Sequence, residues 1–288
     1  MKKILKQKTA FSLFELSIVL VLIAIIVGGI SEGSALILKS RLASAGRLTQ
    51  NSEIEKTNDL VAWFETSSPD SFSSDSLENA TPIASWQNRA VNNVNLRHAL
   101  QINATNQPIL INHAINKALP ALQFSGNQWL SFANADFNNS SYTIFIVEQR
   151  NSGANDNFFI SSQGSGAANF LAGYSSSNNL RFIHGSTNIN FGLAAYNQEQ
   201  QVIRIHTLLF KTNGELKYFM NGGVDADANS LSFDTAWGID EITIGAAQNV
   251  GQYNGFIAEI ILFKRNLLTE ERRQIEGYLG KKYNIEIN

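Results

Sequence analysis

Acidic residues are the side chains of this sequence with the clearest capacity for chemistry, and their spacing argues against sugar hydrolysis. A retaining glycosidase needs two carboxylates about 5–5.5 Å apart, which residues two apart on one face of a strand can supply. Asp225 and Asp227 form the only such pair in residues 58–288. Glu148 and Glu259 stand in apolar, strand-like runs without an acidic neighbour, and we expect both to face solvent. The sequence therefore predicts no catalytic residues and no enzymatic activity.

The aspartate pair also raises the question of a metal site. Asp225, Asp227 and Asn229 alternate along a loop-like stretch, as the oxygen ligands of calcium loops do. An EF-hand would continue with glycine and glutamate, where this chain has Ser230 and Ala236. We expect a solvated turn and no bound cofactor, with a calcium site of another kind as the alternative.

Cysteine and histidine offer little further chemistry. The chain has no cysteine, which excludes disulfides and thiolate metal sites. Its histidines, which lack the paired spacing of a zinc site, are His98, His113, His184 and His206. His206 stands inside an apolar run, which predicts a buried core residue.

Aromatic side chains are the remaining candidates for ligand contact, because a flat ring can stack on a sugar. Trp63 and Trp86 lie in strand-like segments and are expected to pack in the core. Trp129 and Trp237 lie near turns, and they are the candidate ligand-binding residues of the chain.

The charge balance excludes nucleic acid as a partner. Residues 58–288 hold fourteen Lys or Arg and twenty Asp or Glu, a net charge of −6. Phosphate binding needs clustered cations, which this region lacks.

These candidates must be positioned by two kinds of element, the first of which is an N-terminal apolar helix. Four lysines lie within residues 1–8, and no charge falls between Glu15 and Glu32. As a helix, Phe11–Ile30 is long enough to cross a hydrocarbon core of about 30 Å, and the lysines predict a cytoplasmic N-terminus. A cleaved signal peptide and a plain anchor are alternatives. Neither explains Glu15, whose carboxylate should face a partner rather than lipid.

The motif KTAFSLFE at residues 8–15 resembles the processing site of type IV pilins and of the pseudopilins of type II secretion. The resemblance implies that residues 1–10 are a leader, cut between Ala10 and Phe11 by a prepilin peptidase. Phe11 would then become the N-methylated terminus. Glycine is commoner than alanine before the cut. The resemblance also implies that Glu15 acts in subunit assembly, by pairing with the terminal amine of a neighbouring pilin or pseudopilin subunit.

The helix is expected to continue from Phe11 to about Lys56, so residues 11–57 form the transmembrane and assembly segment. Apolar residues recur there at three- and four-residue spacing beyond the membrane-spanning part. Its first half would contact inner-membrane lipid or neighbouring helices.

The second kind of element is a series of short strands in residues 58–288. Runs rich in β-branched and aromatic residues recur between Asn, Ser and Gly, for example at 142–149, 201–210 and 255–264. This pattern is typical of an all-β sandwich or barrel. A final helix with Glu270 and Glu271 in its first turn closes the chain.

Two segments in this region resemble concanavalin-like, laminin-G-like jelly-roll domains. "NGFIAEIILFKRNLLTEERRQIEGYLGKKYNI" at 254–285 is similar to their closing strand and helix, and "LVAWFETSSPDSF" at 60–72 to their opening strand. The fold expected for the whole chain is a long N-terminal helix, transmembrane in its first half, followed by an all-β jelly-roll sandwich with a short C-terminal helix.

Three functions are compatible with this organisation. The first is a structural or adhesive subunit of a type IV pilus or a type II secretion pseudopilus, minor or at the tip, displaying a jelly-roll domain. The second is a singly anchored extracytoplasmic protein that binds carbohydrate and never assembles. The third is an anchored glycoside hydrolase. All three place the chain in the bacterial inner membrane with a single pass and the jelly roll outside.

Overall fold

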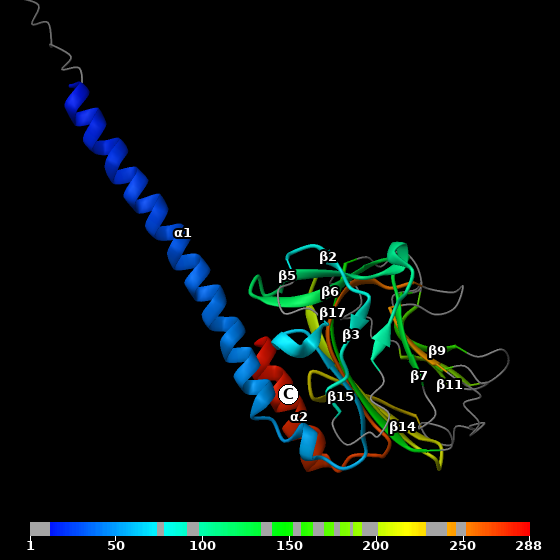
Figure 1. Ribbon diagram of the computed structural model, residues 1–288. Helices are drawn as coiled ribbons and strands as arrows, with labels where there is room; N and C mark the ends of the chain where they lie inside the picture. The colour runs from blue at the N-terminus through cyan, green and yellow to red at the C-terminus, as the bar shows by residue number, and fades with distance from the viewer. Residues whose placement is uncertain are drawn as a thin grey trace, which may run out of the picture. The chain divides into compact units, whose positions relative to one another are not determined.

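The computed structural model of the protein is shown in Figure 1. It describes residues 12–73, 78–90, 98–133, 140–151, 157–163, 170–175, 179–184, 187–191, 201–228, 241–245 and 252–288. The chain divides into two compact units, Met1–Ala43 and Ser44–Asn288. We call the second unit the head.

The N-terminal helix α1 (Leu13–Gln50) has 38 residues, about 57 Å at 1.5 Å per residue. It ends earlier than expected, because the Ser52 backbone and hydroxyl groups both donate to the Thr49 carbonyl, at 3.2 and 2.8 Å. Such local bonds compete with helix continuation. A 3₁₀ turn, η1 (Ile54–Lys56), then buries Ile54 in the head.

The first part of α1 has apolar side chains that are exposed in the described part of the chain. Its large side chains from Leu13 to Ile37 are mostly more than half exposed. It is the one helix among the described residues that is apolar and long enough to cross a membrane, with a mean hydropathy of 2.8 in its most apolar window. This confirms a single candidate membrane-spanning segment.

The head is a sandwich of two antiparallel sheets that pack face to face (Figure 1). Sheet A has the strand order β15-β14-β13-β8-β17-β6-β5-β2, and β1 also pairs with β17. Its strands are β1 (Leu60–Glu65), β2 (Thr81–Pro82), β5 (Ile109–Ile115), β6 (Leu119–Ser125), β8 (Tyr142–Arg150), β13 (Ile203–Lys211), β14 (Glu215–Met220), β15 (Gly223–Ala228) and β17 (Asn254–Phe263).

Sheet B has the order β12-β11-β10-β9-β16-β7-β4-β3. Its strands are β3 (Ser85–Trp86), β4 (Ala99–Leu100), β7 (Leu130–Ala133), β9 (Asn157–Gln163), β10 (Phe170–Tyr174), β11 (Leu180–His184), β12 (Thr187–Phe191) and β16 (Glu241–Ile244). Two further 3₁₀ turns are η2 (Pro69–Ser71) and η3 (Ala104–Asn106).

The central strands β8 and β17 of sheet A are buried on both faces, as the near-continuous apolar run in β17 predicts. On the inner face of sheet A, Ile260 and Leu262 join the core shared with sheet B. On its outer face Ile261 and Phe263 join a second core. The helix α2 (Thr269–Tyr283) covers that second core with one apolar side, including Ile275.

The last turns of α1 pack into the same second core. Ala45 of α1 and Ile54 of the following turn η1 are buried there together with the indole of Trp63. The fold expected from sequence is therefore confirmed: a long N-terminal helix, an antiparallel β-sandwich and a short C-terminal helix.

Candidate functional site

Several carboxylates among the described residues have notable partners, and the first lies at the start of α1. Glu15 is exposed, and its carboxylate accepts a hydrogen bond from the Ser12 backbone N–H at 2.9 Å. In return, the Glu15 N–H donates to the Ser12 hydroxyl at 3.2 Å. This reciprocal pair is a capping box, which satisfies backbone donors at a helix N-terminus. Glu15 therefore has a local structural role that the sequence analysis missed, although the Ser-x-x-Glu spacing signals it.

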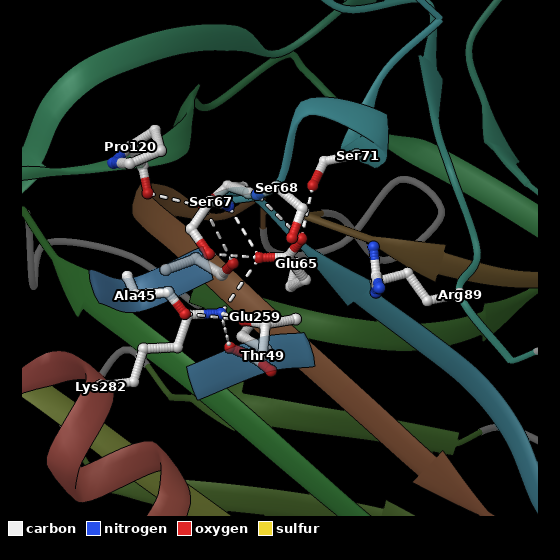
Figure 2. A network of polar contacts seen from close by, with 12 residues as sticks. Ala45, Thr49, Glu65, Ser67, Ser68, Ser71, Arg89, Pro120, Glu259 and Lys282 are labelled. Carbon is white, nitrogen blue, oxygen red and sulfur yellow. Dashed lines mark hydrogen bonds and ion pairs between the residues drawn. The ribbon is translucent and has the colours of Figure 1, made fainter. Parts of the chain in front are cut away.

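The second place is a buried cluster on the outer face of sheet A, shown in Figure 2. Lys282, on α2, is fully buried there. Its ammonium lies 3.0 Å from Glu65 Oε2 and 2.8 Å from Glu259 Oε2. Glu65 and Glu259 stand opposite each other in the register of β1 and β17, which brings both carboxylates to one cation. We call these three residues, with Thr49 and Tyr278, the Lys282 cluster.

Glu65 is held as a carboxylate by many donors. It accepts hydrogen bonds from the backbone and hydroxyl groups of Ser67, the backbone of Ser68 and the hydroxyl of Ser71, at 2.6–3.0 Å (Figure 2). Burial alone would raise the pKa of Glu65, but the charge of Lys282 and these hydrogen bonds hold it well below its usual range. The carboxylate is therefore ionised, and both of its oxygens accept hydrogen bonds from the protein.

Glu259 is equally enclosed. It accepts hydrogen bonds from the indole of Trp63 at 2.7 Å and from the hydroxyls of Tyr278 and Tyr283 at 2.9 and 2.8 Å. Burial would lower the pKa of Lys282, but the nearby carboxylate of Glu259, with the tyrosines and Glu65, raises it well above its usual range. The ammonium therefore stays charged inside the protein.

The cluster also ties the end of α1 to the rest of the head. The Lys282 ammonium donates to the Thr49 hydroxyl at 2.8 Å, and that hydroxyl lies 3.1 Å from the hydroxyl of Tyr278 (Figure 2 shows Thr49 and Lys282). Thr49 is 1% exposed. One buried cation thus joins α1, both strands and α2.

The expectation that Glu148 and Glu259 face solvent is wrong. Both are fully buried. Glu148 points into the core between the sheets, where the hydroxyl of Tyr174 donates to it at 2.8 Å and Tyr253 donates a further hydrogen bond. The Nε2 atom of His206 lies 2.8 Å from Glu148 Oε1. Inward-facing acids are identified only by the register of the finished sheet, because an apolar strand buried on both faces gives no solvent side to assign.

His206 is a buried core residue, as predicted. It is 1% exposed, and its Nδ1 lies 2.7 Å from the Tyr218 hydroxyl. His184 is buried as well, with Nδ1 3.0 Å from the Tyr142 hydroxyl, and burial lowers the pKa of His184 to about 4. Among the described residues, no group of three or more His, Cys, Asp or Glu could hold a metal ion.

The remaining predicted site residues fall in different places. Asp225 and Asp227 lie in strand β15, with Asp227 opposite Lys217 of β14, and not in the loop expected from sequence. The calls made from sequence at Ala10, Phe11, Asn229 and Trp237 concern positions outside the described residues. Trp63 and Trp86 are fully buried, as predicted.

Trp129 is partly exposed and lies just before β7. Its backbone N–H donates to the Asn106 carbonyl at 3.0 Å, and its own carbonyl accepts from Gln101 Nε2 at 3.3 Å. The structure therefore brings Trp129 beside the loop 101–107, a neighbour that the sequence analysis did not identify.

In the described part of the chain, Glu65 and Glu259 are fully buried carboxylates. Glu65 and Glu259 share the Lys282 cation, neither has exposed surface, and each accepts several hydrogen bonds from protein donors. Their arrangement stabilises the packing of α2 and α1 on sheet A.

No protein-family model matches this chain, and no curated protein sequence matches it. Solved structures share its fold. The sialidase of Trypanosoma rangeli, in complex with the inhibitor DANA, aligns with a TM-score of 0.53 and 14% identity over 76% of this chain and 33% of its own. The receptor binding domain of botulinum neurotoxin D aligns with a TM-score of 0.54 and 10% identity over 77% of this chain and 53% of its own.

A third structure is matched over nearly its full length. Domain 4 of AbnA, a GH43 extracellular arabinanase from Geobacillus stearothermophilus in complex with arabinotriose, has a TM-score of 0.51 and 13% identity, over 76% of this chain and 98% of its own. This chain spans about a third of the length of the sialidase. At these identities the shared feature is the β-sandwich fold.

Proposed function

We propose that this chain is a pilin-like subunit of a type IV pilus or a type II secretion pseudopilus, which displays the β-sandwich head. The observation that carries the proposal is the first part of α1. A helix with an uncovered apolar surface needs lipid or other helices around it, and this one also carries an exposed carboxylate at its N-terminal end.

Glu15 supports assembly rather than simple anchoring. In the described chain its carboxylate accepts a hydrogen bond from a backbone N–H of its own helix. This donor is uncharged, so it does not neutralise the carboxylate. Cleavage after Ala10 would create an ammonium on Phe11 of each subunit. A charge in a low-dielectric environment is stabilised by an opposite charge, so packing of helices would pair Glu15 with the Phe11 amine of a neighbour.

The proposal assigns the leader to residues 1–10, the membrane and assembly helix to residues 11–57, and display to the β-sandwich. The partners are a prepilin peptidase, other subunits and inner-membrane lipid. The head would have no enzymatic activity, in keeping with the burial of the strand carboxylates Glu65, Glu148 and Glu259. The head is large beside the helix that carries it, which favours a minor or tip subunit over a bulk one.

Replacement of Glu15 separates its two roles. Glu15→Gln keeps the capping box, which accepts Glu or Gln, but removes the charge; Glu15→Ala removes both. If the charge docks the subunit, both variants should be depleted at least a hundredfold from sheared filaments or pseudopilus fractions. That depletion corresponds to the roughly 3–5 kcal/mol expected when one member of a buried pair is lost. Both should still reach the membrane.

Glu32→Gln is the matched control, because Glu32 is an exposed carboxylate on the same helix. It should assemble like wild type. If Glu15→Gln assembles as well as wild type while Glu15→Ala does not, Glu15 acts only as a helix cap and the docking proposal fails.

A second candidate function is a singly anchored protein that binds carbohydrate and does not assemble. It is favoured by the fold comparison, because the similar structures include a sialidase solved with sialic acid and a domain solved with arabinotriose. In that case, neither Glu15 variant would change the location or the activity of the protein.

A further inference from the structure

A positively charged segment of α1 follows its most apolar part, which ends at Glu32. Lys39 and Arg41 come next among the charged residues, and both are exposed. No acidic residue occurs between Glu32 and Glu53. Neither cation therefore has an acidic residue three or four positions away, the spacing at which helical side chains pair. We call residues 32–41 the juxtamembrane segment.

The position of the two cations along α1 matches the headgroup layer of a membrane. A hydrocarbon core of about 30 Å takes about 20 helical residues, and headgroups add roughly 5–8 Å on each side. Twenty residues counted from Leu13, the first residue of α1, end at Glu32. Lys39 and Arg41 then lie about 10.5 and 13.5 Å further along the axis. Because side chains on a helix tilt toward its N-terminus, these long cations extend back toward the lipid phosphates.

The apolar side chains of the juxtamembrane segment fit the same layer. Leu36 and Ile37 are 70% and 57% exposed, and Leu36 lies about 6 Å beyond Glu32. Apolar groups are removed from water when they lie at the boundary between acyl chains and headgroups. The cations, one turn further, stay in the hydrated layer that holds the phosphates.

The two cations lie on different sides of the helix. At about 100° per residue, Lys39 and Arg41 are about 160° apart around the axis, whereas Glu32 and Lys39 are within about 20° of each other. A protein partner contacts a helix along one side, but lipid surrounds it. Cations on opposite sides and at nearly the same depth therefore favour lipid headgroups over a second copy of the chain.

We propose that Lys39 and Arg41 bind the phosphates of anionic phospholipid headgroups, where α1 leaves the membrane at its C-terminal end. The inference rests on the membrane-inserted subunit of the proposed function and deepens it, because it gives that subunit a lipid class and a fixed depth. Arg41 has the larger share. Its side of the helix carries no carboxylate, whereas Glu32 repels phosphates on the side of Lys39.

The test uses a single fluorescent label beside the two cations. The chain has no cysteine, so Leu36→Cys can be labelled alone. The labelled full-length protein is reconstituted in phosphatidylcholine vesicles that contain a small fraction of nitroxide-bearing phosphatidylglycerol or nitroxide-bearing phosphatidylcholine. The ratio of the two quenching efficiencies measures the enrichment of anionic lipid at this position. The lysines of residues 1–8 do not contribute, because the membrane-spanning segment separates them from the label.

The ratio should be about five or more at low salt, since each cation near an anionic surface contributes about that factor, and it should fall as salt is raised. Arg41→Gln should lower the ratio more than Lys39→Gln, and the double variant should bring it close to one. Glu32→Gln should raise it. Arg47→Gln is the matched control, because Arg47 is an exposed cation about 9 Å further along the same helix. It should leave the ratio unchanged.

A ratio near one without these substitutions, or an unchanged ratio in the double variant, would overturn the proposal. Soluble glycerol phosphate should not lower the ratio; if it does, the cations bind free phosphate and not lipid. A ratio near one together with depletion of the double variant from filaments would assign the cations to a second copy. The vesicles hold no assembly machinery, so Glu15→Gln should keep the full ratio. Failure of this inference is therefore distinguishable from failure of the proposed function.

Discussion

Glu15 and Glu65 are two carboxylates in apolar surroundings, and the protein treats them in opposite ways. Glu65 is fully buried and accepts five hydrogen bonds, one of them from the Lys282 ammonium. Glu15 is exposed and accepts a hydrogen bond from a backbone N–H of its own helix. In the head, the buried charge of Glu65 has its partners within the protein. In the first part of α1, the charge of Glu15 and the apolar side chains are exposed.

The two carboxylates therefore differ in role: Glu65 contributes to stability, and Glu15 to the proposed assembly. A charge with a complete set of internal partners holds the fold together. In the proposed function, the exposed charge of Glu15 has its counterpart on a neighbouring subunit. In the proposed function, the region of α1 before Ser44 is the part of the chain that contacts lipid and neighbouring subunits.

The largest expected effect comes from separating the two regions. A fragment of residues 44–288 retains both cores and the Lys282 cluster. It should be water-soluble and rich in β-structure by circular dichroism, whereas the full chain should require detergent or membrane. A fragment of residues 58–288 should be soluble but less stable by several kcal/mol, because it loses the buried side chains of Ala45, Thr49 and Ile54.

Denaturant unfolding of the two fragments checks this directly. Equal stability would show that the end of α1 contributes nothing to the head. A fragment of residues 44–288 that still needs detergent would break the comparison, because the head would then have uncovered apolar surface of its own.

Removal of the buried cation is the next largest effect. Lys282→Met leaves Glu65 and Glu259 buried without their counter-charge, and it should lower the free energy of unfolding of the head by about 3–5 kcal/mol. Lys281→Met is the matched control, because Lys281 is exposed on the same turn of α2. It should change stability by less than about 0.5 kcal/mol. A similar small loss in both variants would contradict the structural role of the Lys282 cluster.

The two proteins should also differ in their pH dependence. In wild type the folded-state pKa of Glu65 is lowered, so its contribution is present at neutral pH and is lost as the pH falls below the ordinary carboxyl value of about 4.3. In Lys282→Met, Glu65 stays buried but loses the nearby positive charge that lowers its pKa. The folded-state pKa of Glu65 is therefore higher in the variant than in wild type. The stability gap between the two proteins should therefore narrow as the pH falls below the ordinary carboxyl value of about 4.3, and a gap independent of pH would contradict this assignment.

The smallest effect concerns the link to α1. Thr49→Val keeps the size of the side chain but removes the hydroxyl that accepts from Lys282, so it should cost about 1 kcal/mol. Thr49→Ser keeps the hydroxyl and should cost less. Hydrogen exchange should show faster opening of residues 44–50 in Thr49→Val alone. Equal exchange in both variants would mean that this hydroxyl does not hold the helix end.

The fold could be predicted from sequence because its signals are local. Strand runs, the apolar N-terminal helix and the acidic first turn of α2 each appear within about ten to twenty residues. The buried charges could not be predicted in the same way. Glu65 and Glu259 meet only through the pairing of β1 with β17, and Lys282 looks like an ordinary cation at a helix end until α2 is placed on sheet A.

The same limit applies to the candidate ligand site. Trp129 stands out in the sequence as an aromatic residue near a turn, but its hydrogen-bond partners Gln101 and Asn106 come from a different loop. The Ser12–Glu15 capping box, by contrast, has a local signature that the sequence does contain. The same residues also resemble a processing site, and that resemblance is the more conspicuous of the two patterns.

The most direct test of the central claim is the N-terminus of the protein isolated from its native host. Removal of residues 1–10 from the 288-residue chain leaves 278 residues that begin at Phe11. The account predicts this mature chain, one methyl group heavier than its sequence, by intact-mass analysis and N-terminal sequencing. A terminus at Met1, or one near Ser34, would contradict it.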